Sequence, residues 1–137
     1  MNREELLARL RALPWDSQDY WLITGGAMVL YGLRERTHDV DLGCTTALAD
    51  ALEAQGHPYQ VTPDGNRWFK LGEELELFEN WLRDTVVRVE GVPVVSLRGL
   101  LEMKLALGRE KDLRDAALIR AHLARGEAGT IQKEENP

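Results

Sequence analysis

Residues 20–42 read YWLITGGAMVLYGLRERTHDVDL, and this segment contains the strongest structural signals in the chain. Residues 20–24 are mostly apolar and aromatic, which predicts a short buried strand that Gly25-Gly26 is expected to break. Residues 27–33 are apolar on nearly every side, which favours a helix that packs on both faces. Residues 39–42 alternate polar and apolar side chains and predict a second strand.

The rest of the chain extends this alternation of helices and strands. Four further helices are predicted at residues 2–13, 45–55, 97–107 and 111–124. Five further strands are predicted at residues 59–61, 67–71, 74–78, 86–89 and 92–95. The resulting order predicts a mixed α+β fold, in which a mixed β-sheet is flanked by helices and two helices close the chain. We expect one domain over residues 1–125 and a flexible tail over 126–137.

The amino-acid composition excludes several classes of protein. The chain has 137 residues, of which 44% are hydrophobic, and this suits one soluble domain with a true core. The net charge of −6 argues against a general nucleic-acid binder. A single cysteine, Cys44, excludes a disulfide framework, and no apolar run is long enough to span a membrane. We therefore expect a cytoplasmic protein without membrane contact. The four tryptophans are interpreted as packing residues.

Asp39 and Asp41 form the first candidate metal site. Residues i and i+2 of a strand point to the same face, about 6.5 Å apart. Two carboxylates side by side repel each other unless a cation lies between them, and this favours Mg²⁺ or Mn²⁺. The alternative is a solvated strand edge without a metal.

Two other features complete the candidate site. A glycine pair where a strand leads into a helix lets a ligand approach the backbone, and free N–H groups at the helix start bind anions. The alternative is a tight turn that serves packing.

Glu76, between two leucines on a predicted strand, is a candidate third carboxylate. Glu74 lies on the same face and competes with it.

The three features occur in an order that resembles a known signature. Thr24-Gly25-Gly26, Asp39-Val40-Asp41-Leu42 and Leu75-Glu76-Leu77 are similar to the motifs of the DNA-polymerase-β-like nucleotidyltransferases. Residues 22–42, with Arg36-Thr37-His38 before the second motif, most resemble the small bacterial branch. That branch includes AbiEii-like toxin transferases, lincosamide-type antibiotic transferases and minimal nucleotidyltransferases. The resemblance covers about residues 20–120.

The resemblance implies an enzyme that transfers a nucleoside monophosphate from an NTP to an acceptor hydroxyl. It implies that Asp39, Asp41 and Glu76 are catalytic and hold the metal. The basic residues near the C-terminus resemble an AbiEii-like segment, Lys104 followed by Arg109-Glu110-Lys111-Asp112 and Asp115. The implied nucleotide-binding residues are Thr24, Gly25, Gly26, Arg36, Lys104 and Lys111.

The acceptor stays open at this level. A tRNA, a protein or a small molecule such as an antibiotic fits the resemblance, as does a toxin–antitoxin setting. A homodimer or a partner protein could complete the pocket. The third acid is a glutamate where the family more often has aspartate. Two alternatives are a non-catalytic relative that binds a nucleotide or a partner, and an interaction module with a chance motif.

Overall fold

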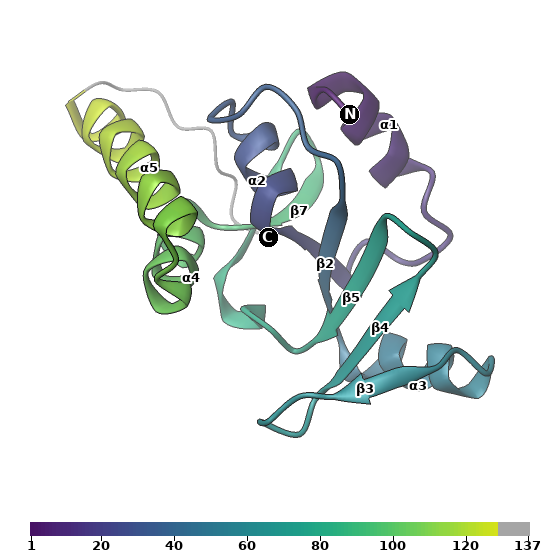
Figure 1. The fold of residues 1–137 in the computed structure, drawn as a ribbon. Coiled ribbons are helices and arrows are strands. Elements are labelled where there is room, and N and C mark those ends of the chain that lie inside the picture. The colour runs from purple at the N-terminus through teal and green to yellow at the C-terminus, as the bar shows by residue number, and fades with distance from the viewer. Residues whose placement is uncertain (129–137) are drawn as a thin grey trace.

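The computed structural model describes residues 1–128 of the chain (Figure 1). The helices are α1 (Arg3–Arg11), α2 (Thr24–Leu30), α3 (Thr46–Ala54), α4 (Leu97–Leu107) and α5 (Glu110–Ala128), with a 3₁₀ turn η1 (Arg83–Thr85). The strands are β1 (Tyr20–Ile23), β2 (Val40–Cys44), β3 (Tyr59–Val61), β4 (Arg67–Leu71), β5 (Leu75–Glu79), β6 (Val86–Val89) and β7 (Val92–Val95). Because α5 continues to Ala128, the tail predicted from residue 126 falls largely on 129–137, outside the described residues.

All seven strands join one mixed sheet in the order β3-β4-β5-β2-β1-β7-β6. The hairpins β3-β4-β5 and β6-β7 are antiparallel, as the middle of the sequence predicts. The contacts β2-β5 and β1-β7 are parallel and bring distant parts of the chain together. Helices α4 and α5 stand as a pair beside the sheet (Figure 1). The predicted mixed α+β fold with two C-terminal helices is confirmed.

One row of apolar side chains crosses the sheet and forms its core. Leu22 pairs with Val94 on one side and with Leu42 on the other. Leu42 pairs with Leu77, which in turn pairs with Phe69. All five side chains are fully buried. Since successive strand residues point to opposite faces, the neighbours of this row lie on the other side of the sheet, which we call the open face.

Three caps on the helices α3 and α4 match the local sequence. Thr45 and Ser96 are the N-caps of α3 and α4, and each side-chain oxygen accepts a hydrogen bond from a backbone N–H three residues later. Gly108 ends α4 with a φ of 64°, a conformation that glycine adopts without a steric penalty. These local signals explain why the predicted ends of α3 and α4 lie so close to the observed ones.

The junction between β1 and α2 differs from the prediction. The helix begins at Thr24, whose φ is 56°, so both glycines lie in its first turn rather than in a loop before it. Strand β2 begins at Val40, so Asp39 precedes the strand. Strand β5 is shifted by one residue and begins at Leu75. The alternation of polar and apolar residues correctly predicts which face of the sheet each side chain occupies. It does not show at which residue the hydrogen bonding of a strand begins or ends.

None of the helices in the described part of the chain is sufficiently long and apolar to cross a lipid bilayer.

Candidate functional site

Asp41 lies on β2 at the open face of the sheet. It pairs in register with Ile23 of β1 and with Glu76 of β5, so its carboxylate projects beside that of Glu76. The Thr24 hydroxyl donates a 2.7 Å hydrogen bond to Asp41 Oδ2. The other oxygen, Oδ1, is buried and has no hydrogen-bond partner among the described residues. A buried carboxylate oxygen without a partner is costly unless a ligand completes it.

The electrostatics around Asp41 disfavour an isolated negative charge. Burial, as the largest cause, raises the pKa of the Asp41 carboxyl from 3.8 to about 6, and the nearby carboxylates of Glu76 and Asp39 contribute to this shift. The hydrogen bond from Thr24 opposes this shift without cancelling it. A cation at Oδ1 would give this buried oxygen the partner that it lacks. It would also neutralise the negative charge that Asp41 shares with Glu76 and Asp39.

Glu76, rather than Glu74, is the glutamate beside Asp41. Its Oε1 accepts a 2.9 Å hydrogen bond from the indole Nε1 of Trp68. Glu74 lies just before β5, and its carboxylate contacts the Arg9 guanidinium at 3.4 Å. The structure therefore brings Glu76 to the diacid and turns Glu74 toward α1.

Asp39 does not share the enclosed position of Asp41. It is exposed and precedes the strand, and its backbone carbonyl accepts a hydrogen bond from the Thr37 hydroxyl. Within residues 1–128, no group of three or more His, Cys, Asp or Glu side chains is arranged to hold a metal ion. Mg²⁺ commonly uses one or two carboxylates together with substrate phosphates and water, so a site completed by a substrate fits these residues better than an all-protein cage.

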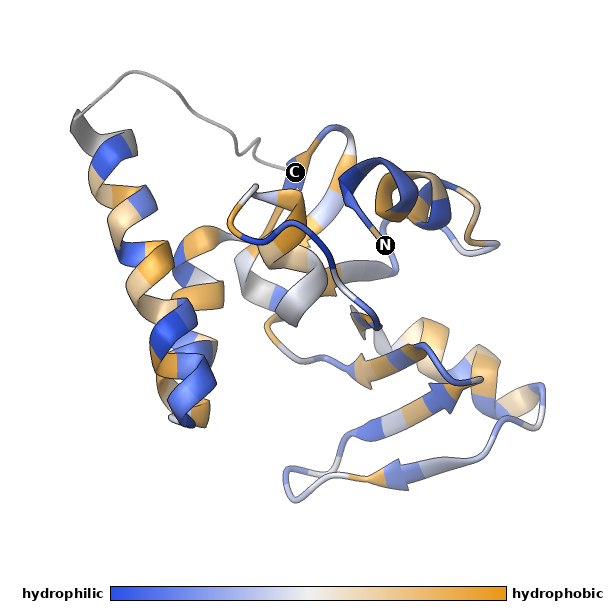
Figure 2. Ribbon diagram, turned by 45° about the horizontal axis from the view of Figure 1, so that its top comes forward, coloured by the Kyte–Doolittle hydropathy of each residue, from blue (hydrophilic) through white to orange (hydrophobic). Residues whose placement is uncertain are grey.

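A cleft of about 420 Å³ opens above Asp41. It contains seven of the predicted site residues, namely Thr24, Gly25, Arg36, Asp39, Asp41, Lys104 and Lys111. Arg34, Thr37, His38, Leu107, Arg109 and Asp115 complete its lining. Five basic and three acidic residues therefore line this cleft, in a protein whose net charge is −6. The loop that joins α2 to β2 borders the cleft and is mostly hydrophilic (Figure 2). This local excess of positive charge suits a polyphosphate.

Lys104 lies in the cleft wall but is not a free cation. Its Nζ contacts Asp115 Oδ2 at 2.9 Å and Asp112 Oδ1 at 3.7 Å, and its side chain is buried. The sequence prediction that Lys104 meets the nucleotide phosphates directly therefore needs correction. A buried ammonium group requires such partners, and Lys104 is best described as the centre of an ion network that shapes the cleft. Asp112 and Asp115 are likewise buried members of this network rather than simple helix-start charges.

The two glycines each allow a close contact where a side chain would otherwise lie. A Cβ on Gly25 would lie 2.8 Å from Arg34 Nη1, so the missing side chain lets this guanidinium approach the helix start. A Cβ on Gly26 would lie 2.7 Å from Leu22 Cδ1. Gly26 is buried and does not line the cleft, so its role is close packing of α2 on β1. Close packing therefore accounts for both glycines, and the role of Gly25, which lines the cleft, in binding a ligand stays a prediction.

Arg36 and Lys111 are the predicted cations that remain exposed at the cleft. The nearest acidic partner of Arg36 is Glu5, at 3.7 Å, and 70% of the Arg36 side chain is accessible. Such a weak surface contact costs little to break. Both residues are therefore free to reach an anion in the cleft.

Sequence reasoning missed two contributors. Arg34 forms a bidentate pair with Asp115, with N–O distances of 3.0 and 2.9 Å, and this pair ties the loop after α2 to α5. No local sequence pattern predicts a contact between residues that are 81 positions apart. Trp68 was assigned to packing, yet it positions Glu76. The alternation of β4 places Trp68 on the open face, and this was the available signal.

Comparison with known proteins supports the fold. No protein-family model matches the chain, and no curated protein matches it. Among solved structures, a candidate nucleotidyltransferase from Thermotoga maritima has a TM-score of 0.50 and 16% identity, over 89% of this chain and 90% of that one. ANT(2″)-Ia, solved with adenylyl-2″-tobramycin, has a TM-score of 0.56 and 16% identity, over 90% and 88%. At this identity the likeness establishes a shared fold.

Proposed function

We propose that the chain is a metal-dependent nucleotidyltransferase that moves a nucleoside monophosphate from an NTP to an acceptor hydroxyl. One observation carries the proposal: Asp41 has a buried oxygen without a partner, beside Glu76 and at the base of a basic cleft. The fold supports it, because a solved neighbour with the same fold was captured with an adenylyl group joined to tobramycin.

The cleft would hold the triphosphate. Arg36 and Lys111 are exposed at its rim and would pair with phosphate oxygens. Gly25, which has no side chain, lets the Arg34 guanidinium approach the start of α2 at the wall of the cleft. Asp41, with Asp39 and Glu76 nearby, would hold Mg²⁺ or Mn²⁺. The bound ion would supply Lewis-acid neutralisation of the charge on the phosphates.

The residues also define the course of the transfer. The acceptor oxygen forms a bond to the α-phosphorus, and the bond from that phosphorus to pyrophosphate breaks. The proton of the acceptor hydroxyl passes to a carboxylate on the open face. Glu76 suits this role because the Trp68 N–H fixes one of its oxygens and holds the group beside Asp41. Positioning and electrostatics then account for most of the rate enhancement.

The second candidate function is a non-catalytic relative that binds a nucleotide or a partner. The absence of a complete three-ligand metal group among the described residues is the observation that favours it. The identity of the acceptor and a toxin–antitoxin or AbiEii-like role belong to the proposal of an enzyme. The preferred base, and a homodimer or partner protein that completes the pocket, belong to either function.

Calorimetric titration tests the proposal. The purified chain is titrated with ATP, GTP, CTP and UTP, with and without Mg²⁺, beside an Asp39→Ala/Asp41→Ala variant. We expect at least one NTP to bind only with Mg²⁺ and the variant to lose this binding. An Arg114→Ala variant is the matched control, since Arg114 is exposed on α5 and contacts only Glu110 among the described residues. Equal binding by the double variant would refute the metal site.

A further inference from the structure

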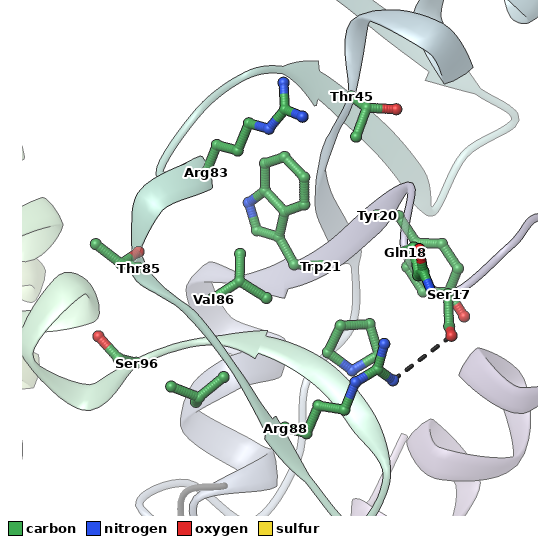
Figure 3. Close-up of a pocket in the computed structure, with 12 residues that line it drawn as sticks. Ser17, Gln18, Tyr20, Trp21, Thr45, Arg83, Thr85, Val86, Arg88 and Ser96 are labelled. Atoms are coloured by element: carbon green, nitrogen blue, oxygen red, sulfur yellow. Dashed lines mark hydrogen bonds between the residues drawn. The ribbon is translucent and has the colours of Figure 1, made fainter. Parts of the chain in front are cut away.

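A second pocket lies beside β1, β6 and β7 (Figure 3) and shares no described lining residue with the basic cleft. It has a volume of about 860 Å³. Trp21 lies within its lining, and in the view of Figure 3 the indole ring lies between Arg83 and Arg88. None of the described residues that line this pocket is acidic.

The pocket begins close to Asp41. Trp21 pairs in register with Gly43, and a Cβ on Gly43 would overlap the indole nitrogen of Trp21. The ring therefore lies directly over Gly43, which is two residues beyond Asp41 on the same strand and the same face. Two strand residues span about 6.5 Å. Trp21 itself is 3% exposed, and its indole N–H donates to the Trp81 carbonyl at 2.7 Å, so the ring belongs to the floor of the pocket near Asp41.

Two arginines, Arg83 and Arg88, are the charged residues among the described residues that line the pocket. Arg88 Nη1 donates to the backbone carbonyl of Gly91 and to the Ser17 hydroxyl, and Arg83 Nη1 donates to the Asn80 amide oxygen. Neither guanidinium forms an ion pair with a carboxylate within the described residues. In contrast, Arg34, Arg67 and Arg109 all have close acidic partners. Two arginines left without acids in an acidic protein are suited to an anionic ligand.

We propose that this pocket, built on Trp21, Arg83 and Arg88, is the acceptor site and takes a small hydroxyl-bearing anion. The inference rests on the proposed function and narrows its acceptor. The guanidinium groups pair with the phosphate or carboxylate of the acceptor. The acceptor hydroxyl then faces Asp41 and Glu76. A polycationic acceptor is disfavoured, because it would meet two unpaired positive charges.

The test reads binding at Trp21 directly, without NTP. The indole N–H signal of Trp21 is followed by ¹H–¹⁵N NMR and assigned with a Trp21→Phe variant. The backbone amide signal of Arg114, which is exposed on α5, serves as the internal reference. The probes are ribose 5-phosphate, gluconate, ribose and spermidine. We expect ribose 5-phosphate or gluconate to shift the Trp21 signal saturably, and ribose and spermidine to leave it in place. The anion that binds identifies phosphate or carboxylate as the recognised group.

Matched variants separate this site from the nucleotide cleft. Arg83→Met/Arg88→Met should weaken anion binding roughly tenfold or more, which is about the loss of one charge-assisted contact. Arg83→Lys/Arg88→Lys should keep most of it, and Arg36→Met in the other cleft should not change it. No shift with either anion, or an equal shift in the double Met variant, would overturn the site. Anion binding by a chain that binds no Mg-NTP would refute the acceptor role together with the proposed function.

Discussion

Replacing Asp41 with asparagine is expected to stabilise the metal-free protein at neutral pH and at the same time to abolish Mg-dependent NTP binding. The side chain keeps its shape, so Thr24 can still donate its hydrogen bond. The variant loses the negative charge that burial, Glu76 and Asp39 all disfavour. It also loses the charged oxygen that would meet the metal. Gain of stability with loss of binding is typical of a residue kept for function.

The sign of the pH dependence follows from the raised pKa. The Asp41 carboxyl titrates near 6 in the folded chain and near 3.8 when unperturbed. Its charge therefore costs nothing below about pH 4, and the cost grows as the pH rises through 6. A shift of this size corresponds to at most about 3 kcal/mol, and solvent at the cleft mouth reduces it to roughly 1–2 kcal/mol.

Urea denaturation without metal, at pH 4 and pH 8, measures this effect. Asp41→Asn and the parent should have similar free energies of unfolding at pH 4. At pH 8 the variant should be more stable by about 1–2 kcal/mol. Glu73→Gln, an exposed position on the turn before β5, serves as the control. A variant that is less stable than the parent at pH 8 would show that Asp41 is a structural residue.

The second large effect is expected at Asp115. Asp115→Ala should destabilise the fold by roughly 3–5 kcal/mol, because it leaves Lys104 buried with a single, longer contact to Asp112. It also releases Arg34 from its bidentate pair, so nucleotide binding should weaken in the fraction that remains folded. Urea denaturation gives the first effect and calorimetry at low temperature gives the second.

Two comparisons make the Asp115 result specific. Lys104→Met removes the buried cation and leaves both acids paired, Asp112 with Arg109 and Asp115 with Arg34. It should therefore cost clearly less than Asp115→Ala. Glu110→Ala, which breaks an exposed pair with Arg114, should cost less than about 0.5 kcal/mol. Equal effects from all three variants would contradict the buried ion network.

Elements with local signals were predicted well from the sequence. Capping residues, alternating strands and turn glycines act over a few positions, so the bounds of α3, α4, β3 and β4 follow from them. Alternation also predicted the faces of Asp41 and Glu76 on their strands, whereas Asp39 precedes β2 and is exposed. The register that brings Glu76 beside Asp41 was not predicted, since it depends on a parallel contact between β2 and β5.

Contacts between residues that lie far apart in the chain could not be predicted from the sequence. The prediction for Lys104 gave its place at the cleft but not its burial, because Asp112 and Asp115 reach it only once α4 and α5 have packed. Arg34 was missed for the same reason. The sequence predicts packing roles for Trp21 and Trp68, whereas in the structure Trp21 lines a pocket and Trp68 donates a hydrogen bond to Glu76.

The central claim is that Asp41 holds a divalent cation against the phosphates of an NTP. A crystal structure with Mn²⁺ and a non-hydrolysable NTP, read by anomalous scattering, tests it most directly. We predict a Mn²⁺ peak at Asp41 Oδ1, with the triphosphate in the cleft beside Gly25, Arg36 and Lys111. Nucleotide bound elsewhere, or a metal that avoids Asp41, would contradict the account.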